Sequence, residues 1–252
     1  MGSVRVIGVE GLPIIKEGDD IASLICSYAE KQETPIQNGD VIVITHVVLS
    51  RAEGRVVNLS RIVPSEFAKN IARQSGRDPA LVEVVLRESR SIVRMEDGKL
   101  ITETLSGLVC ANSGVDRSNV PGKGMVALLP KDADRSAEKI RGEIRELTNC
   151  DVAVIISDTQ GRPLRRGEIN IALGVAGINP MRNRRREEDL FGYVLKVKRT
   201  TIVDELASAA ELVMGQGSEG VPVAIIRGYN YPEPGKMRAS DLIRPRKKDM
   251  FV

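Results

Sequence analysis

Three short runs made only of apolar residues constrain the fold of this chain most strongly. They are Val41-Ile-Val-Ile44, Val152-Ala-Val-Ile-Ile156 and Val223-Ala-Ile-Ile226. Runs of this length suit strands, and a continuously apolar strand is typical of a sheet that is covered on both faces. Because helical patterns separate these runs, residues 1–252 are expected to form a mixed α and β fold (α+β). It is either one unit or two closely joined α/β subdomains with mixed sheets and no clear linker.

Turn and capping residues predict the elements around these runs. Asp19 or Asp20 is expected to cap a helix, and Pro64 and Pro79 are each expected in the first turn of a helix. Further expectations are strands at 4–9 and 125–129, a hairpin around Asp97-Gly98, and helices over 130–147 and 201–215. The order strand, helix, strand from 125 to 156 predicts a right-handed crossover onto a parallel neighbour.

Composition excludes several classes of protein. The 37 basic and 34 acidic residues nearly balance, and aromatic residues make up only 3% with no Trp, so nucleic acid is not a predicted partner. His46 is the only histidine, which excludes a histidine pair or a His-rich metal site. Cys26, Cys110 and Cys150 form no metal motif and no even disulfide set, which indicates reduced thiols. Since no apolar run is long enough to span a membrane and no leader pattern is visible, a cytoplasmic protein is expected.

Residues 106–122 place small and oxygen-bearing residues directly after a short apolar run. Asp116 is followed three residues later by Asn119, and Gly114 and Gly122 allow the backbone to approach a ligand closely. Such a loop suits a hard metal ion that holds a phosphate. The alternative is a polar turn in which Asp116 and Asn119 bond their own backbone.

A second site of the same kind follows the run that ends at Ile156. This strand is expected to deliver Ser157, Asp158 and Thr159 at its carboxyl end, where ligands of open α/β sheets commonly bind. Three arginines come next and suit phosphates or substrate carboxylates, with a structural role as the alternative: Arg162, Arg165 and Arg166. Together, the two aspartate segments predict a site for a divalent metal and phosphates.

A third oxygen-rich loop, Gly215-Gln-Gly-Ser-Glu-Gly-Val-Pro222, precedes the last apolar run. It is of the type that binds phosphate or metal, although it is not a Walker sequence because no Gly-Lys-Thr follows. The alternative is a simple helix stop.

Taken in order, these segments and several others resemble the coenzyme F420-0:gamma-glutamyl ligase family. The motifs cover nearly the whole chain and are Gly11–Ile14, Gly18–Asp20, Ser50–Gly54, Ala111–Gly122, Ile156–Thr159, Gly161–Pro163, Gly174–Gly177, Asp189–Gly192, Val213–Gln216 and Glu219–Pro222.

The resemblance implies an enzyme that uses GTP to add L-glutamate to F420-0 through an acyl phosphate, with release of GDP and phosphate. It also implies a further gamma-linked glutamate added to F420-1, two Mg²⁺ or Mn²⁺ ions, an additional K⁺, and a homodimer that completes an active site at strand-end loops. Asp116 and Asp158 are then the catalytic metal ligands, with Thr159 and Gln216 as weaker ligands. The implied nucleotide-binding residues are Gly11, Leu12, Pro13, Ile14, Thr45, His46, Arg51, Asn119, Gly215, Gln216, Gly217, Ser218, Glu219, Gly220 and Val221.

Some expectations stay open at this point. Many relatives carry a lysine where this chain has Val47, so His46 and Arg51 are the candidates that meet the nucleotide phosphates. Two other functions compete with ligation: a metal-dependent nucleotide or phosphate-ester hydrolase, and a nucleotide- or flavin-binding sensor module. The basic run 182–186 is expected to be a solvated loop, with an electrostatic collar for a polyanionic substrate as the alternative.

Overall fold

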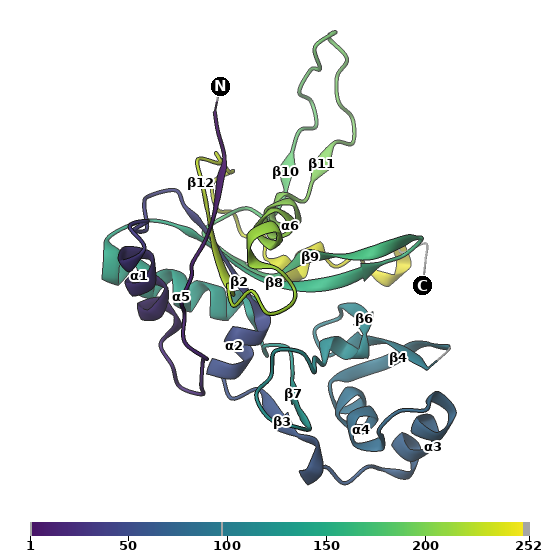
Figure 1. Cartoon of the computed structure of the whole chain (residues 1–252). Helices are drawn as coiled ribbons and strands as arrows, with labels where there is room; N and C mark the ends of the chain where they lie inside the picture. The colour runs from purple at the N-terminus through teal and green to yellow at the C-terminus, as the bar shows by residue number, and fades with distance from the viewer. Residues whose placement is uncertain (1, 97, 249–252) are drawn as a thin grey trace.

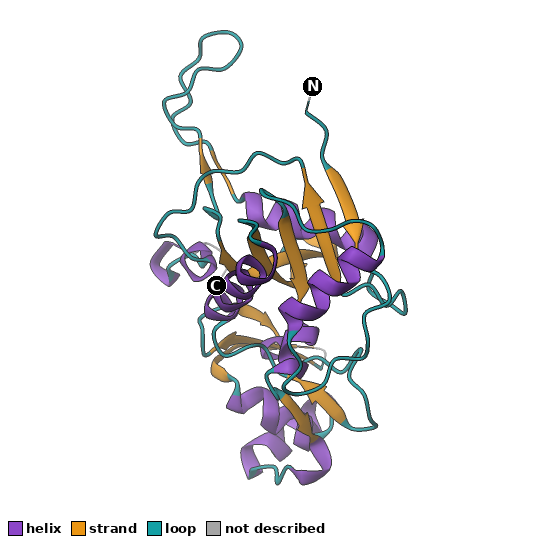
Figure 2. Ribbon diagram, turned by 90° about the vertical axis from the view of Figure 1, so that its left-hand side faces the viewer, coloured by secondary structure: helices purple, strands orange, loops and turns teal. Residues whose placement is uncertain are grey.

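A five-stranded mixed sheet forms the centre of the molecule in the computed structural model, which describes residues 2–96 and 98–248 (Figures 1 and 2). The strand order is β1-β12-β2-β8-β9. β2 and β8 are parallel, and the other neighbours are antiparallel. The strands are β1 (Arg5–Gly8), β2 (Val41–Thr45), β8 (Ala153–Arg162), β9 (Arg165–Ala176) and β12 (Val223–Arg227).

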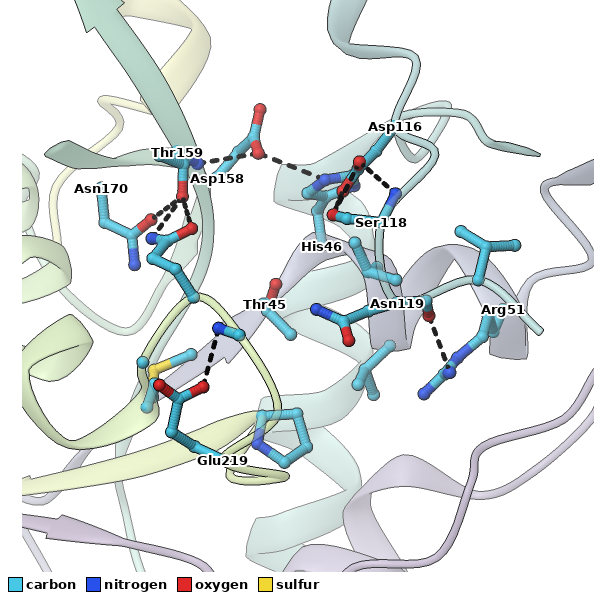
Figure 3. A pocket seen from close by; sticks show the side chains of 18 of the residues that line it. Thr45, His46, Arg51, Asp116, Ser118, Asn119, Asp158, Thr159, Asn170 and Glu219 are labelled. Atoms are coloured by element: carbon cyan, nitrogen blue, oxygen red, sulfur yellow. Dashed lines mark hydrogen bonds and ion pairs between the residues drawn. The ribbon is translucent and has the colours of Figure 1, made fainter. Parts of the chain in front are cut away.

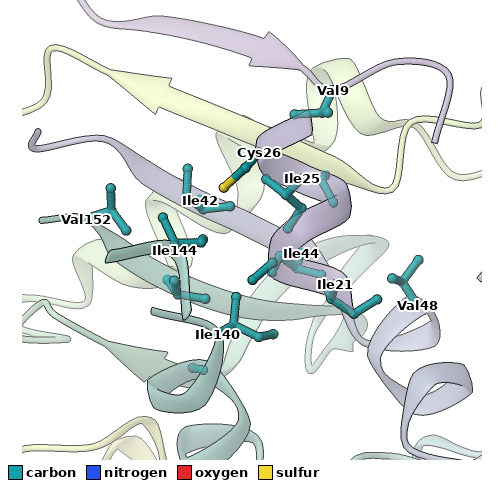
Figure 4. Packing of buried hydrophobic residues seen from close by; sticks show 14 of the residues in the cluster. Val9, Ile21, Ile25, Cys26, Ile42, Ile44, Val48, Ile140, Ile144 and Val152 are labelled. Carbon is teal, nitrogen blue, oxygen red and sulfur yellow. The ribbon is translucent and has the colours of Figure 1, made fainter. Parts of the chain in front are cut away.

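Helices cover both faces of this sheet, as the apolar runs predict. One face packs against α1 (Ile21–Lys31) and α5 (Ala133–Thr148), and the other against α6 (Ile202–Met214). Along β2, Ile42 and Ile44 belong to the first core, part of which Figure 4 shows, while Val41 and Val43 belong to the second. Because side chains alternate along a strand, an apolar residue is needed at every position.

A second, smaller group of elements lies between α2 (His46–Ala52) and α5 in the chain (Figure 1). Its three-stranded sheet has the order β4-β5-β6, and a two-stranded sheet pairs β3 with β7. Its own core includes Leu81, Val85 and Leu100. The elements are β3 (Val56–Asn58), η1 (Leu59–Arg61), α3 (Glu66–Ser75), α4 (Pro79–Arg87), β4 (Ser89–Glu96), β5 (Lys99–Thr104), β6 (Val109–Ala111), η2 (Asn112–Gly114) and β7 (Met125–Ala127).

The mixed α and β fold is therefore confirmed, whereas the predicted crossover is wrong. β7 pairs with β3 outside the main sheet, and the parallel neighbour of β8 is β2. The rule for right-handed crossovers applies to strands of one sheet. Here β3 and an isolated bridge to Asp116 hold β7 in the smaller group.

Two helix starts differ from the expectation and two agree with it. Ser65 caps α3 by accepting from the backbone N–H of Ala68, so Pro64 precedes the cap instead of lying in the first turn. α5 begins after its cap Asp132, later than expected. Asp20 caps α1 and Pro79 lies in the first turn of α4, both as predicted, and Asp78 is the cap of α4. The β4–β5 hairpin is also confirmed, although Asp97 in its turn lies outside the described residues.

A narrow arm over residues 182–200 projects from the body of the molecule (Figures 1 and 2). β10 (Arg182–Asn183) pairs with β11 (Arg199–Thr200) at its base. The arm exposes large apolar side chains, with Leu190 97% and Phe191 94% accessible. After α6 and β12, the last elements that the structure describes are two short helical turns, η3 (Ala239–Leu242) and η4 (Arg246–Lys248). Among the described residues, no helix is both long enough and apolar enough to cross a membrane.

The α3–α4 corner gives a prediction about acid stability. The Ser65 hydroxyl, the Ser65 backbone N–H and Arg87 all donate to the carboxylate of Glu83, and these bonds lower its pKa from 4.5 to about 2. A carboxyl group whose pKa is lowered by folding stabilises the native state above its unfolded pKa. That contribution disappears as the pH falls from about 4.5 towards about 2.

We therefore expect Glu83→Gln to lose about 1–3 kcal/mol of unfolding free energy at pH 7. The difference from the unsubstituted protein should shrink steadily between pH 4.5 and pH 3 in urea titrations. Glu66→Gln is the control, because Glu66 pairs with Lys69 on the exposed surface of α3, where solvent screens the pair, and should change stability much less than Glu83→Gln. A difference for Glu83→Gln that does not depend on pH would contradict this account.

Candidate active site

A cavity of about 720 Å³ lies between the main sheet and the smaller group of elements. Its walls come from segments far apart in the chain, within 12–14, 45–51, 111–121, 158–170 and 214–222. Figure 3 shows how side chains from these segments face one hollow. The chain thus brings together the three loops that the sequence marks as sites for phosphate or metal.

Most of the residues predicted for the site line this cavity. They are Leu12, Pro13, Ile14, Thr45, His46, Arg51, Asp116, Asn119, Asp158, Thr159, Gly215, Gln216, Gly217, Glu219, Gly220 and Val221. Gly11 and Ser218 are not among the lining residues, and neither are the three arginines after Asp158 or the basic run 182–186. Sequence reasoning missed Gln160, Glu168 and Asn170, which line the wall formed by β8 and β9.

The structure corrects one point about Asp158. It does not lie in a loop past the end of the strand, because β8 continues to Arg162 in a long hairpin with β9. The register shifts between Ile156 and Ser157, where Leu173 is the extra residue on β9. A bulge of this kind redirects side chains next to functional sites. Polar residue types indicated a loop, but the backbone groups of Asp158 and Thr159 are paired within the sheet.

Asp158 is held by three kinds of donor. Its Oδ1 lies 3.2 Å from Nε2 of His46 and accepts from the backbone N–H of Thr159 at 2.7 Å. Its Oδ2 accepts from the side-chain amide of Gln160 at 2.6 Å. His46 is the first residue of α2 and only 2% exposed, with Nδ1 3.5 Å from the hydroxyl of Ser50. Packing and hydrogen bonds therefore fix the direction of the Asp158 carboxylate.

Asp116 lies in a tight loop after η2. Ser113, at φ 52°, anchors this loop through hydrogen bonds of 2.7 Å with the hydroxyls of Ser89 and Thr102. The Asp116 carboxylate accepts from the backbone N–H and the hydroxyl of Ser118. The alternative of a self-bonded polar turn thus describes its local contacts correctly. The same side chain also lines the cavity.

The loop after α6 closes the cavity beside Thr159. The Gln216 amide nitrogen lies 2.7 Å from the Thr159 hydroxyl and 2.6 Å from Oε1 of Glu211, while the same hydroxyl donates to Asn170. Glu219 folds back to accept from the backbone N–H of Gly217 at 2.7 Å. Gly215 adopts φ 69° and ψ 179°, a conformation that favours glycine.

Arg51 supplies positive charge on another wall of the cavity. Its guanidinium donates to the backbone carbonyl of Asn119 at 3.1 Å, and its Nε is buried without a partner among the described residues. Burial lowers its pKa. This guanidinium is therefore available to an anion that enters the cavity.

The cysteines offer no nucleophile to this site. Burial, and then the negative charge of Asp158, raise the pKa of Cys110 to about 12, and burial raises that of Cys26 to about 11. All three cysteines are free thiols. Buried, protonated thiols are inert, and none of the three cysteines lines the cavity.

The oxygen donors of the cavity suit a hard divalent cation. Two carboxylates, a hydroxyl and an amide oxygen are the ligand types that Mg²⁺ accepts, and such an ion takes its remaining ligands from water and substrate phosphates. Within residues 2–96 and 98–248, no group of three or more His, Cys, Asp and Glu side chains could hold a metal by itself. The donor set fits an ion that a phosphate helps to hold, and it does not fit a closed structural metal site.

Fold and cavity together define a class: a mixed α/β protein with a polar cavity, lined by two aspartates and glycine-containing loops, between its two groups of elements. A family profile described as F420-0:Gamma-glutamyl ligase matches residues 11–228. The chain therefore belongs to the F420-0:gamma-glutamyl ligase family, which confirms the resemblance found in the sequence.

Similar proteins span the whole chain. A protein named coenzyme F420:L-glutamate ligase from Methanocaldococcus jannaschii is 49% identical, over 98% of this chain and 96% of the relative. Proteins with the same name from Methanothermobacter thermautotrophicus and Methanopyrus kandleri are 47% and 46% identical, the first over 98% of both chains and the second over 100% of both.

Proposed function

We propose that this protein is a GTP- and divalent-metal-dependent ligase that joins L-glutamate to F420-0, and then a further gamma-linked glutamate to F420-1. The observation that carries the proposal is one cavity lined by Asp116, Asp158 and two glycine-rich loops, in a chain of this ligase family. The names of the relatives support the substrates. GTP as the phosphoryl donor follows from the family resemblance.

The proposed reaction has two steps. A carboxylate oxygen of F420-0 attacks the γ-phosphorus of GTP, the bond to the β-phosphate oxygen breaks, and GDP leaves. The neutral amine of glutamate then attacks the carbonyl carbon of the acyl phosphate, the carbon–oxygen bond breaks and phosphate leaves. The nitrogen loses one proton to solvent or to the departing phosphate, which gives the amide. Neither step needs a protein nucleophile, because phosphoryl transfer depends on positioning and charge neutralisation.

The side chains have distinct roles in this proposal. Asp116 and Asp158, with Thr159 and Gln216, would hold two Mg²⁺ or Mn²⁺ ions, with K⁺ as a further ion. When bound, such ions neutralise the charge of the transferring phosphoryl group. Of the two candidates for the place of the lysine that many relatives carry at Val47, Arg51 is proposed to face the phosphates, because both ring nitrogens of the buried His46 lie against Asp158 and Ser50. The remaining nucleotide contacts are proposed for residues 11–14, Thr45, Asn119 and 215–221.

A direct assay separates this proposal from its rivals. The purified protein is incubated with GTP, Mn²⁺, L-glutamate and F420-0, and product mass is followed. Release of GDP that requires glutamate, together with product heavier by one and then two glutamyl residues, is the expected result. Phosphate release without glutamate would instead indicate a hydrolase, and binding without turnover a sensor module. Parallel reactions with ATP test the choice of nucleotide.

The contact between His46 and Asp158 predicts a positioning role. Partners that orient a metal ligand typically change metal affinity by about 10- to 100-fold when removed. We therefore expect His46→Leu to weaken Mn²⁺ binding by that factor, as measured by electron paramagnetic resonance of free Mn²⁺. His46→Gln keeps an N–H donor and should recover part of the affinity. Equal Mn²⁺ affinity in His46→Leu and the unsubstituted protein would contradict this role.

We also propose that the protein is a homodimer. The exposed apolar side chains of the arm support an interface, since contiguous exposed apolar surface commonly marks an interaction site. Sedimentation equilibrium should give twice the mass of the 27.5 kDa chain. Phe191→Asp, at the tip of the arm, should reduce the dimer fraction, and a monomeric mass for the unsubstituted protein would contradict the proposal.

A further inference from the structure

Two arginines face each other across the end of the β8–β9 hairpin. Arg162 and Arg165 are paired in register and close the turn formed by Pro163 and Leu164. Residues paired across antiparallel strands place their side chains on the same face, and like charges directly opposite one another are destabilising. A third arginine, Arg166, follows immediately.

No counter-ion accompanies these charges in the part of the chain that the structure describes. None of the ion pairs found there involves Arg162, Arg165 or Arg166. Arg162 donates one bond to the backbone carbonyl of Arg166, and its buried Nε has no partner. The exposed Glu168, in the same hairpin, forms no ion pair with them. Repulsion that the protein leaves uncompensated indicates a place for an external anion.

The position of the pair connects it to the cavity. Asp158 and Gln160 are spaced by two residues along β8, so their side chains leave the same face of the strand. Arg162 follows two residues later, past a register shift between Gly161 and Arg162. The hydrogen bond between Asp158 and Gln160 agrees with this alternation. Gln160 and Gly161 line the cavity, and Arg162 is the next residue. At about 3.3 Å per residue, the arginine pair starts about 13 Å from Asp158 along the strand.

We propose that Arg162 and Arg165 bind an anionic group, phosphate or carboxylate, of a substrate other than the nucleotide. This inference rests on the proposed ligase function and identifies the part of the site that takes a second polyanion. A substrate that extends along β8 would place its reacting group near Asp158 and another negative group between the two guanidiniums. Both F420-0 and L-glutamate meet this requirement as acids, and the experiment distinguishes them.

The nucleotide is the less suitable ligand for the pair. The glycine-rich loop 215–221 and the segment 12–14 line the cavity together with Thr45, at the carboxyl end of β2. The arginine pair instead lies at the far end of the hairpin, past the residues that line the cavity. A phosphate chain held by the glycine-rich loop therefore leaves the hairpin end to the other substrates.

The test compares Arg162→Met, Arg165→Met and Arg165→Glu with the unsubstituted protein. Arg165→Glu is the sharpest variant because it places opposite charges across the hairpin, which favours the fold, while it removes the anion site. Arg145→Met is the matched control, since Arg145 is an exposed arginine in the last turn of α5 and does not line the cavity. Measurements are KM for GTP, F420-0 and L-glutamate, and calorimetric binding of F420-0 and of L-glutamate to nucleotide-free protein.

We expect Arg165→Glu to unfold at the same or a higher temperature while KM and Kd for one of the two acids rise about 10- to 100-fold. KM for GTP in the Arg165→Glu protein should stay within about threefold of the value for the unsubstituted protein. All three KM values of the control variant should stay within the same range. An effect on F420-0 or on glutamate identifies the bound acid, whereas an effect on GTP alone, or none, overturns the inference. Absence of glutamate-dependent product in the unsubstituted protein would overturn the ligase function itself, and calorimetry then still reports whether the arginines bind either acid.

Discussion

Asp158→Asn should lower turnover by at least about a thousandfold while the protein remains folded. The substitution keeps the size of the side chain and removes the negative charge that we propose holds a cation. Stabilisation of transferring phosphoryl groups by cations is worth several kcal/mol, and about 4 kcal/mol corresponds to a thousandfold in rate. Initial rates of GDP release at saturating GTP, glutamate and F420-0 measure this loss.

Two further measurements show whether a loss of activity in Asp158→Asn comes from the site and not from unfolding: its melting temperature and the activity of a control variant. Asp158 keeps acceptor capacity for the backbone N–H of Thr159 as asparagine, so the melting temperature should move by only a few degrees. Asp151→Asn removes an exposed carboxylate that pairs with Arg141 and should retain nearly full activity. An active Asp158→Asn protein would show that the cation role assigned to this residue is wrong.

Asp40→Ala should produce the largest loss of stability among the substitutions considered. Asp40 is 1% exposed at the start of β2, and both of its oxygens accept from Arg227 at the end of β12, at 2.8 and 2.7 Å. The hydrogen bond from Arg227 to Asp40 raises the pKa of the guanidinium. Removing one partner of a buried ion pair leaves an uncompensated charge and costs about 3–5 kcal/mol.

Chemical denaturation of Asp40→Ala measures this loss, and the exposed pair of Asp151 and Arg141 serves as its control. Asp151→Asn should cost less than about 1 kcal/mol because solvent screens an exposed pair. The two substitutions thus compare a buried and an exposed ion pair on the same protein. Equal losses of unfolding free energy in Asp40→Ala and Asp151→Asn would contradict the claim that burial makes the Asp40 pair more important for stability.

The central sheet could be predicted because the signal for each strand lies within the strand's own residues. Every residue of Val41–Ile44 and Val223–Ile226 must be apolar when two cores enclose the strand, and this signal is visible in the sequence. The cap Asp20 was predictable for the same reason, since its side chain bonds the backbone only a few residues away.

Pairing between distant segments could not be predicted in the same way. Nothing within Met125–Leu129 indicates that this strand pairs with β3 and bridges to Asp116. Its sequence is equally compatible with the predicted pairing with β8. The long hairpin was missed because Thr159, Gln160 and Gly161 have turn-like composition, while their strand geometry depends on β9. α2 was missed because its cap residue Thr45 makes no side-chain capping bond.

The candidate site was predictable in composition and not in contacts. The carboxylate, amide and glycine segments around Asp116, Asp158 and Gln216 line one cavity, as expected. The contact between His46 and Asp158 required the structure, because it joins α2 to β8 across 112 positions of the sequence. The assignment of metal and nucleotide to these side chains stays a prediction.

Anomalous diffraction from a crystal grown with Mn²⁺ and GTP tests the central claim most directly. The account predicts a manganese peak within direct coordination distance, about 2.0–2.2 Å, of carboxylate oxygens from both Asp116 and Asp158, with the triphosphate on the same ion cluster. A triphosphate bound elsewhere, or manganese that contacts neither carboxylate, would contradict it.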